Sequence, residues 1–512
     1  MIRENTFTAL NDETLLQASC RTENGALSFP TTGDARLDLF FKTVRGINVT
    51  DLYQLIEKSW EMSKRDTLRT MFYVRDCRGG KGEKKIFWYF MIWLWDNHRE
   101  YFMNNIHCVP HYGSFKDLKR IIESKDGEKD ATGGCQRDGV LSQTVISFWC
   151  DVIKKDIESM DSGSPISLAA KWIPIQDTRF CKEMGLTHKN FRKAIRALRD
   201  KLDIVECKMS ANEWEKITFE RVCSLSMKKY SASFKKHCEE RFSEYLKSVK
   251  KGEKKMNVSQ LYPSDISKEF LNQPPVASCD EETLNIAWEQ LLLKTRKNLS
   301  SKFLCVVDTS GSMNGMPLQV AVSLGLFLSE LYPESTFYRK FITFSNSPKL
   351  QTAEGNTLKE RIMNISKSEW SMNTDLQKVF DLILSSSKPE DHPDVLIILS
   401  DMQFDEAVKE DRPQCWGKQK EEENENKEEI TNLAMIEEKY KKAGIKRPKL
   451  IFWNLREGTV DFPANTSTPD CALVSGYSPS ILETLLETGD ITPMNVFRRT
   501  IDSCRYDMVY TS

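Results

Sequence analysis

The chain has 512 residues, of which 40% are apolar and 10% aromatic, so it can bury the cores of more than one domain. Its formal net charge of −1 excludes a global field that attracts nucleic acid or membranes, and any basic surface must be local. The start lacks the apolar core of a signal peptide, and the longest apolar run, 86–95, is too short to span a bilayer. With 14 cysteines scattered without C-x-x-C pairs, we expect a soluble, cytoplasmic protein with reduced thiols and no membrane partner.

The first half of the chain has the periodicity of helices. From about residue 34 to 250, apolar residues recur at steps of three and four, as in 34–46, 51–62 and 242–251. Turn-forming stretches separate these segments, so helices of ordinary length are expected to pair as hairpins. No fixed-period repeat is present in the sequence. We therefore predict an N-terminal extension, 1–33, followed by an all-helical, HEAT-like repeat domain over 34–290.

Two stretches of the helical half carry an excess of positive charge. Residues 181–255 contain 20 Lys or Arg against 11 Asp or Glu, and basic residues at 189–199 form one stripe of a helix. In 75–85 basic residues surround glycines that are expected to bring backbone amides close to a phosphate. The second stretch lacks the spacing of a P-loop. The alternative is an ordinary solvated helix face. The candidate RNA-binding residues are Arg75, Arg78, Lys81, Lys84, Lys85, Lys189, Arg192, Lys193, Arg196 and Arg199.

After about residue 295 the pattern changes to short apolar runs alternating with amphipathic segments. Five runs have the length and composition of buried strands: 302–308, 337–345, 393–401, 449–455 and 471–476. Such alternation predicts a Rossmann-like, doubly wound parallel sheet over 295–512, with helices on both faces. Residues 346–354 are expected to turn back as an antiparallel edge strand. The charged stretch 405–429 is expected to be a solvated loop without a chemical role.

Polar side chains follow two of these strands directly. Asp308, Ser310 and Ser312 come after the first run, and Asp401 ends the run at 393–401. Thr374 opens the helix between them. Because ligands bind beyond the carboxyl ends of the strands where the winding reverses, we expect these five side chains to converge. Carboxylate and hydroxyl oxygens without thiolate or imidazole suit Mg²⁺, Mn²⁺ or Ca²⁺.

The stretches DTSGS, NTD and SDMQFD resemble the metal-ion-dependent adhesion site of von Willebrand factor A domains. The resemblance implies that Ser310, Ser312 and Thr374 are inner ligands, that Asp308 and Asp401 act largely through water, and that one coordination position takes a partner's carboxylate. A simpler interpretation is that the serines only cap the next helix. GSMNG is not a nucleophile elbow, and no histidine follows Asp401, which argues against a Ser-His-Asp hydrolase.

A second resemblance covers most of the chain. The stretches 22–46, 75–94, 111–118, 168–174, 451–456 and 474–482 are similar to an uncharacterised family of the domain-of-unknown-function 2828 type, which joins a helical domain to a von Willebrand A domain. This layout is similar to that of the Ro ribonucleoprotein autoantigen family, which combines a TROVE domain with a von Willebrand A domain. The Ro resemblance implies recognition of structured RNA by the helical part.

These observations predict a non-enzymatic binding protein. We expect the basic helical domain to bind RNA, and the magnesium-dependent site to dock an acidic group of a protein partner; DNA is not predicted. The first alternative is a protein-protein interaction scaffold that binds no RNA. The second is a metal-assisted hydrolase, for which the sequence offers oxygen ligands but no convincing general base.

Overall fold

The computed structural model describes residues 20–123, 139–271, 279–296, 302–344, 348–366, 374–385, 392–406, 431–457, 461–486 and 491–512. The chain divides into two compact units. The sheet unit consists of Met1–Gly46, Asn298–Gly476 and Leu482–Arg499, and the helical unit of Ile47–Lys297, Tyr477–Ile481 and Thr500–Ser512. Neither unit is therefore continuous in sequence. The predicted boundaries differ in two respects: by their contacts, the residues up to Gly46 belong with the sheet unit, and Tyr477–Ile481 and Thr500–Ser512 belong with the helical unit.

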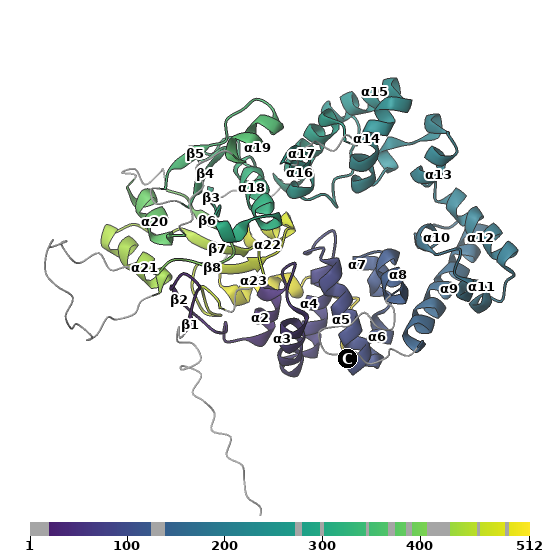
Figure 1. The fold of residues 1–512 in the computed structure, drawn as a ribbon, viewed down its shortest axis with the longest axis horizontal. Helices are drawn as coiled ribbons and strands as arrows, with labels where there is room; N and C mark the ends of the chain where they lie inside the picture. Colours follow the sequence, from purple (N-terminus) through teal and green to yellow (C-terminus); the bar gives the residue numbers. More distant parts are fainter. Residues whose placement is uncertain are drawn as a thin grey trace, which may run out of the picture. The chain divides into compact units, whose positions relative to one another are not determined.

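The sheet unit is built on six strands in the order β5-β4-β3-β6-β7-β8 (Figure 1). All neighbouring pairs are parallel except β4 and β5, which are antiparallel. The predicted strands and the antiparallel edge strand are thus confirmed, and the winding reverses between β3 and β6. The strands are β3 (Phe303–Val307), β4 (Lys340–Thr343), β5 (Leu350–Thr352), β6 (Val395–Ser400), β7 (Lys449–Asn454) and β8 (Cys471–Ser475).

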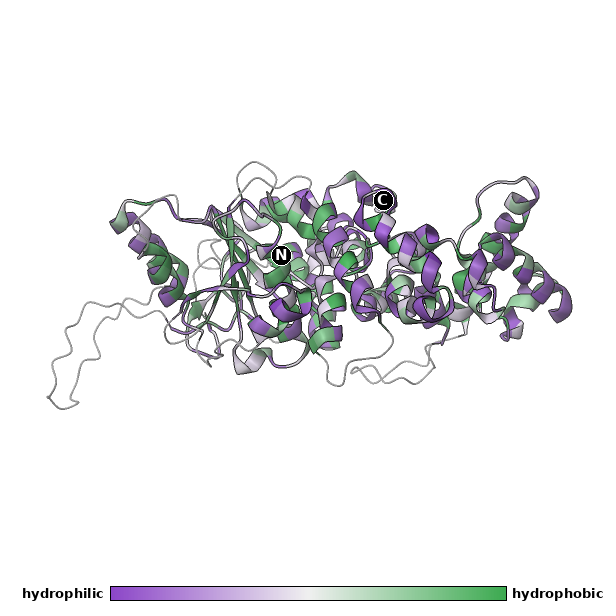
Figure 2. Ribbon diagram, turned by 90° about the horizontal axis from the view of Figure 1, so that it is seen from above, coloured by the Kyte–Doolittle hydropathy of each residue, from purple (hydrophilic) through white to green (hydrophobic). Residues whose placement is uncertain are grey.

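Helices cover both faces of this sheet. α18 packs on β3 and β6, while α20 and α21 contribute Phe380 and Ile436 to the apolar cluster that includes Leu304 and Ile398. Strands β3 and β6 are buried along their whole length, as central strands of a parallel sheet require. Figure 2 shows the strands as a hydrophobic layer. The helices of this unit are α2 (Ala35–Lys42), α18 (Met316–Ser329), α19 (Leu358–Ser366), α20 (Leu376–Leu384), α21 (Asn432–Ala443), α22 (Leu482–Leu486) and α23 (Pro493–Ile501), which ends across the unit boundary, with the short turn η4 (Gly311–Met313).

The N-terminal part of the sheet unit adds a small hairpin and one helix. β1 (Cys20–Arg21) pairs with β2 (Leu27–Ser28), and α2 then packs against β8. Asp34 caps α2 by accepting a hydrogen bond from the amide of Arg36, and Phe41 enters the sheet core. From the sequence, this helix was predicted to belong to the helical domain, because an amphipathic helix has the same spacing of apolar residues whether it packs on other helices or on a sheet.

The helical unit is a succession of helices that pack on their neighbours in the chain. Their lengths range from 4 residues in α10 to 22 in α9, so the HEAT-like repetition stays a prediction. The helices are α3 (Val49–Met62), α4 (Lys64–Arg75), α5 (Lys84–Asn97), α6 (Arg99–Asn105), α7 (Cys108–Tyr112), α8 (Phe115–Glu123), α9 (Val140–Asp161), α10 (Ala169–Trp172), α11 (Thr178–Glu183), α12 (His188–Lys201), α13 (Val205–Ser210), α14 (Ser224–His237), α15 (Glu239–Lys250), α16 (Pro263–Leu271) and α17 (Glu281–Thr295), with 3₁₀ turns η1 (Trp214–Lys216), η2 (Phe219–Arg221), η6 (Pro479–Ile481) and η7 (Cys504–Tyr506).

Two further predictions bear on the surface of the molecule. Within the described ranges, none of the helices combines the length and the apolar composition that a membrane crossing requires. The loop predicted for 405–429 falls almost entirely in 407–430, which lies outside the described residues.

Candidate functional site

Asp308 lies at the reversal point of the sheet, directly after β3. Its amide donates to the carbonyl of Leu399 in β6 (2.9 Å), which extends the β3–β6 pairing by one residue. Its carboxylate accepts hydrogen bonds from the Ser400 hydroxyl (2.5 Å) and from the Ser310 amide (2.9 Å). The side chain is completely buried and fixed at the carboxyl edge of the sheet.

Asp401 follows β6 and faces the same edge. Burial, and after it the negative charge of Asp401, raises the pKa of Asp308 to about 6, against the lowering effect of the bonds from Ser400 and Ser310. Asp401 is 1% exposed, and its carboxylate accepts from the Gln403 amide at 3.3 Å. Two buried carboxylates that repel each other make this edge a favourable place for a cation.

The two serines lie beside these carboxylates, and their hydroxyls cap no helix, although Ser310 is the N-cap residue of η4. The hydroxyl oxygens of Ser310 and Ser312 are 3.0 Å apart on the loop that enters η4. Gly315 is the N-cap of α18, and no side chain caps that helix end; the N-terminus of η4 also has no side-chain cap. The alternative that the serines serve only as caps is therefore not supported.

Thr374 is held in a separate hydrogen-bond network. Its hydroxyl lies 2.7 Å from the carbonyl of Gln403 and 3.0 Å from Asp405 Oδ1, and it accepts from Asn24 Nδ2 at 3.0 Å. Its amide donates to Asp405 Oδ2 (3.0 Å). The structure thus brings Asp308, Ser310, Ser312 and Asp401 to one edge, whereas the Thr374 hydroxyl is bonded to the loop after Asp401.

The hairpin formed by residues 20–28 binds this same loop. Besides its bond to Thr374, Asn24 Nδ2 donates to the carbonyl of Gln403 (2.8 Å), and the Glu23 amide donates to Gln403 Oε1 (2.6 Å). The Thr22 hydroxyl donates to the carbonyl of Phe404 (2.7 Å). No sequence motif indicated these contacts, because their partners are about 350 or more residues away in the chain.

One cation of the chain lies next to the carboxylates. Arg456 follows β7, and its Nη1 is 3.5 Å from Asp401 Oδ2. The side chain is 42% exposed, so the pair is a weak, solvent-screened one. The sequence shows only that Arg456 follows a predicted strand. An arginine at the end of a strand indicates no function unless its partner is known.

The donors at this edge fit a hard divalent cation. Hydroxyl and carboxylate oxygens are the ligands that Mg²⁺, Mn²⁺ and Ca²⁺ prefer. Among the described residues, no three His, Cys, Asp or Glu side chains form a group that could hold a metal ion. A cation at the edge would therefore depend on the serine hydroxyls as well as on the carboxylates.

The candidate RNA-binding residues separate into exposed and buried ones. Arg75 is 2% exposed and donates from Nη2 to Asp117 (2.7 Å), and Lys81 is 1% exposed. Arg199 uses its guanidinium on the carbonyls of Ala170 (2.8 Å) and Ile173 (3.3 Å). Arg75 and Lys81 do not present their charge to solvent, and the half-buried Arg199 uses its guanidinium within the protein, so these three are removed from the candidate surface. The exposed candidates are Arg78, Lys84, Lys85, Lys189, Arg192, Lys193 and Arg196.

The glycine-containing turn at 76–83 is folded onto its own unit. The Gly80 amide donates to the carbonyl of Asp76 (3.1 Å), and a Cβ at Gly80 would lie 2.0 Å from the carbonyl oxygen of Tyr73. The buried Asp76 carboxylate accepts from Arg505 Nη2 (2.8 Å) and from the Tyr506 hydroxyl (3.2 Å). The glycine therefore permits a close backbone approach within the protein, and not the predicted approach to a phosphate.

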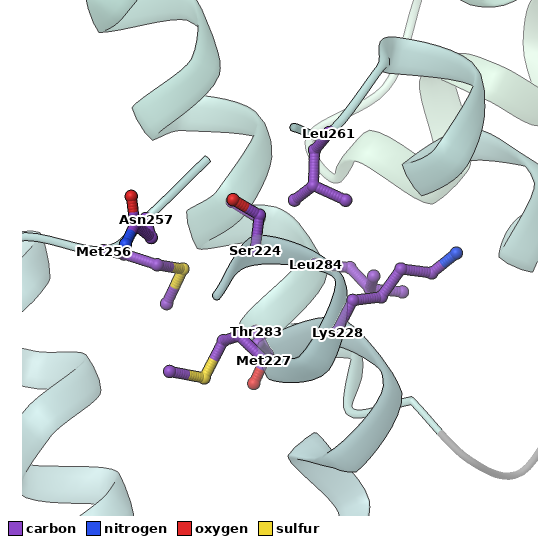
Figure 3. A pocket seen from close by; sticks show the side chains of 9 residues that line it. Ser224, Met227, Lys228, Met256, Asn257, Leu261, Thr283 and Leu284 are labelled. Atoms are coloured by element: carbon purple, nitrogen blue, oxygen red, sulfur yellow. The ribbon is translucent and has the colours of Figure 1, made fainter. Parts of the chain in front are cut away.

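A small cavity lies in the helical unit between α14, α17 and the segment at 256–261 (Figure 3). It has about 10 Å³ of room, enough for about one water molecule. Lys228 lines it and pairs with Glu269 at 2.6 Å. The cavity is too small for a substrate or cofactor. Its lining residues are Ser224, Met227, Lys228, Met256, Asn257, Leu261, Thr283, Leu284 and Ala287.

Comparison with known proteins yields matches to family models and likenesses that extend over most of the chain. A crystal structure of the Deinococcus radiodurans RO (RSR) protein aligns over 96% of this chain and 98% of its own, at 13% identity and a TM-score of 0.32, a value too low to establish a shared fold. The uncharacterized protein L728 of Acanthamoeba polyphaga mimivirus is 26% identical over 523 residues, which cover 94% of this chain and 87% of the relative. The model described as Domain of unknown function (DUF7788) matches residues 302–503. The model described as Domain of unknown function (DUF2828) matches residues 22–133 and 182–300, which confirms the resemblance to that type predicted from the motifs.

Proposed function

We propose that this chain is a non-enzymatic binding protein whose sheet unit docks an acidic group of a protein partner through a divalent cation. The observation that carries the proposal is the pair of buried, mutually repelling carboxylates Asp308 and Asp401, beside two serine hydroxyls that cap no helix. A bound Mg²⁺ would balance these charges and supply a coordination position for a partner's carboxylate.

The residues at the edge have distinct parts in this proposal. Ser310 and Ser312 offer hydroxyl oxygens from one loop, while Asp308 and Asp401 supply negative charge from the ends of adjacent strands. The Thr374 hydroxyl would offer the cation an oxygen lone pair, and one of its two lone pairs is used by Asn24 in the structure. The von Willebrand A resemblance assigns Thr374 as a ligand, and we retain that assignment as part of the proposal.

Calorimetric titration with Mg²⁺ or Mn²⁺ tests the metal site. We expect the unmodified chain to bind one ion, and Ser310→Ala with Ser312→Ala to abolish the binding. A matched control is Ser366→Ala with Ser385→Ala, which removes two hydroxyls bonded only to helix carbonyls of the same unit. If the unmodified chain binds neither ion, or if both double variants bind equally well, the metal site is refuted.

We propose further that the helical unit binds RNA through a basic surface. Support comes from the local charge excess and from the four exposed residues Lys189, Arg192, Lys193 and Arg196, which lie on α12 around a buried face of Phe191, Ile195 and Leu198. The Ro resemblance of the sequence points the same way. Phosphate contacts make such binding strongly salt-dependent.

A gel-shift titration against structured RNAs at several salt concentrations tests this second part. Charge reversal of Lys189, Arg192 and Arg196 is expected to weaken binding and reduce its salt dependence. Absence of salt-dependent binding would leave the protein-interaction scaffold as the better interpretation. Metal-dependent turnover that Asp308→Ala abolishes would instead favour the hydrolase.

A further inference from the structure

Four helices of the helical unit bring together four lysines, of which the sequence indicated only Lys84. Lys116 of α8 and Lys171 of α10 both lie over the ring of Trp172, with their ammonium groups 4.0 and 5.3 Å from its centroid. Two positive charges thus share one aromatic ring. Cation–π attraction holds each of them, but the two ammonium groups repel each other.

The N-terminal ends of α5 and α8 lie close together, which places Lys84 beside Lys116. The amide of Glu83, which precedes Lys84, donates to the carbonyl of Val74 (2.8 Å), and Asp117, which follows Lys116, pairs with Arg75 (2.7 Å). Both helices therefore begin next to the last turn of α4. One turn further on, Arg120 of α8 lies 5.0 Å from the ring centroid of Trp88 in α5, so the two helices stay in contact.

A carboxylate links α14 to the same place. Glu206 pairs with Lys171 at 3.1 Å, and its other oxygen accepts from the Ser226 hydroxyl of α14 at 3.4 Å. Lys229 follows Ser226 by three residues and therefore lies on the same side of α14. The anion cradle, as we name the group Lys84, Lys116, Lys171 and Lys229, is thus assembled from four helices of one unit.

The cradle carries more positive charge than the protein neutralises. Of its four lysines, only Lys171 has a carboxylate partner among the described residues, and Lys84, Lys116 and Lys229 are exposed. Burial, followed by the charges of the other three lysines, lowers the pKa of Lys116, and Glu206 opposes this effect. Unbalanced charge of this density is stabilised by a bound anion.

The basic stripe of α12 lies beside the cradle. Arg199 of α12 donates to the carbonyl of Ala170 (2.8 Å), which holds α12 against the helix that carries Lys171. Further along the same helix, Lys189, Arg192, Lys193 and Arg196 are exposed and carry positive charge. A surface on which charge continues over several helices fits a long polyanion better than a single acidic side chain.

We propose that the anion cradle binds phosphate groups of an RNA backbone, and that the α12 stripe continues this contact. The inference rests on the proposed RNA binding and specifies where the backbone lies. The ring of Trp172 is already occupied by ammonium groups, so the cradle recognises charge and not the identity of a base. Binding is therefore tolerant of sequence.

Fluorescence anisotropy with a labelled oligouridylate, measured on the full chain across salt concentrations, tests the proposal. Lys116→Ala with Lys229→Ala removes two phosphate contacts, and we expect a loss of about tenfold or more in affinity and a salt slope smaller by about 1.4. The matched control is Lys119→Ala with Lys235→Ala, which removes the same charge from the same two helices at residues paired with Glu123 and Asp280. The control is expected to bind nearly as tightly as the unmodified chain, and circular dichroism checks that both variants fold.

The possible results separate the cradle from the wider proposal. If RNA binds and the two double variants weaken it equally, the cradle is wrong although RNA binding stands. If the unmodified chain binds no RNA, both proposals fail. Tighter binding of polyglutamate than of the oligouridylate, with the same loss in the cradle variant, would identify an acidic protein as the ligand and overturn the assignment to RNA.

Discussion

The burial of Lys81 makes the stability of the helical unit depend on pH in a definite direction. Burial lowers the pKa of Lys81 from 10.5 to about 7, while the charge of Glu83 acts in the opposite sense. Between these two pH values the unfolded chain binds a proton that the folded chain has released, so the free energy of unfolding rises with pH. Each pH unit is worth about 1.4 kcal/mol, which gives roughly 5 kcal/mol over the whole window.

Replacement of Lys81 by Met removes this titration. We expect the free energy of unfolding of the unmodified chain, minus that of Lys81→Met, to increase by about 2 kcal/mol from pH 7 to pH 9. Denaturant unfolding followed by far-ultraviolet circular dichroism at several pH values measures the difference. Lys85→Met, an exposed change four residues away, is the control and is expected to show a much smaller slope. A difference that stays constant across this range would show that Lys81 keeps its proton, and would refute the argument from burial.

Three further predictions concern hydrogen bonds and packing. Asn24→Ala frees a lone pair of the Thr374 hydroxyl, and we expect it to tighten Mg²⁺ binding, measured by calorimetry, about three- to tenfold. Weaker binding would contradict this expectation. Thr22→Val is the control, because the Thr22 hydroxyl bonds to the carbonyl of Phe404 and not to Thr374. Gly325→Ala would place a Cβ 2.5 Å from Val307 Cγ2 and should lower the free energy of unfolding by about 1–3 kcal/mol, so an unchanged melting temperature would show that α18 shifts without cost. Asp76→Asn removes the charge that Arg505 neutralises and should cost about 3 kcal/mol in denaturant unfolding, whereas a cost under about 1 kcal/mol would mean that the pair is solvent-screened.

The strands and the edge site were accessible from the sequence because they depend on local order. Apolar runs such as 303–307 end directly before Asp308, and the carboxyl ends of adjacent parallel strands necessarily meet at one edge of a sheet. This rule places Asp401 at the same edge of the sheet as Asp308. The antiparallel β5 could be predicted because the connection to β4 is short.

The remaining contacts depend on partners that are distant in the chain. The sequence identifies Arg75 and Lys81 as basic residues, but it does not show that both are buried or that Arg75 pairs with Asp117, which is 42 residues away. Asn24 reaches Thr374 across 350 residues, and no periodicity encodes that pairing. The lysines of the anion cradle come from four separate helices, so only the packing of those helices reveals the cluster.

The division of the chain into interleaved segments has a consequence for synthesis. The buried Asp76 carboxylate lacks its partner Arg505 until more than 400 further residues have been made, and α2 is made more than 400 residues before β8, against which it packs. Neither unit can complete its packing before these late residues have been made. Chaperones should therefore be needed to protect nascent chains of this protein until residues 500–512 emerge. Ribosome-bound intermediates truncated before Arg505 should remain sensitive to proteases.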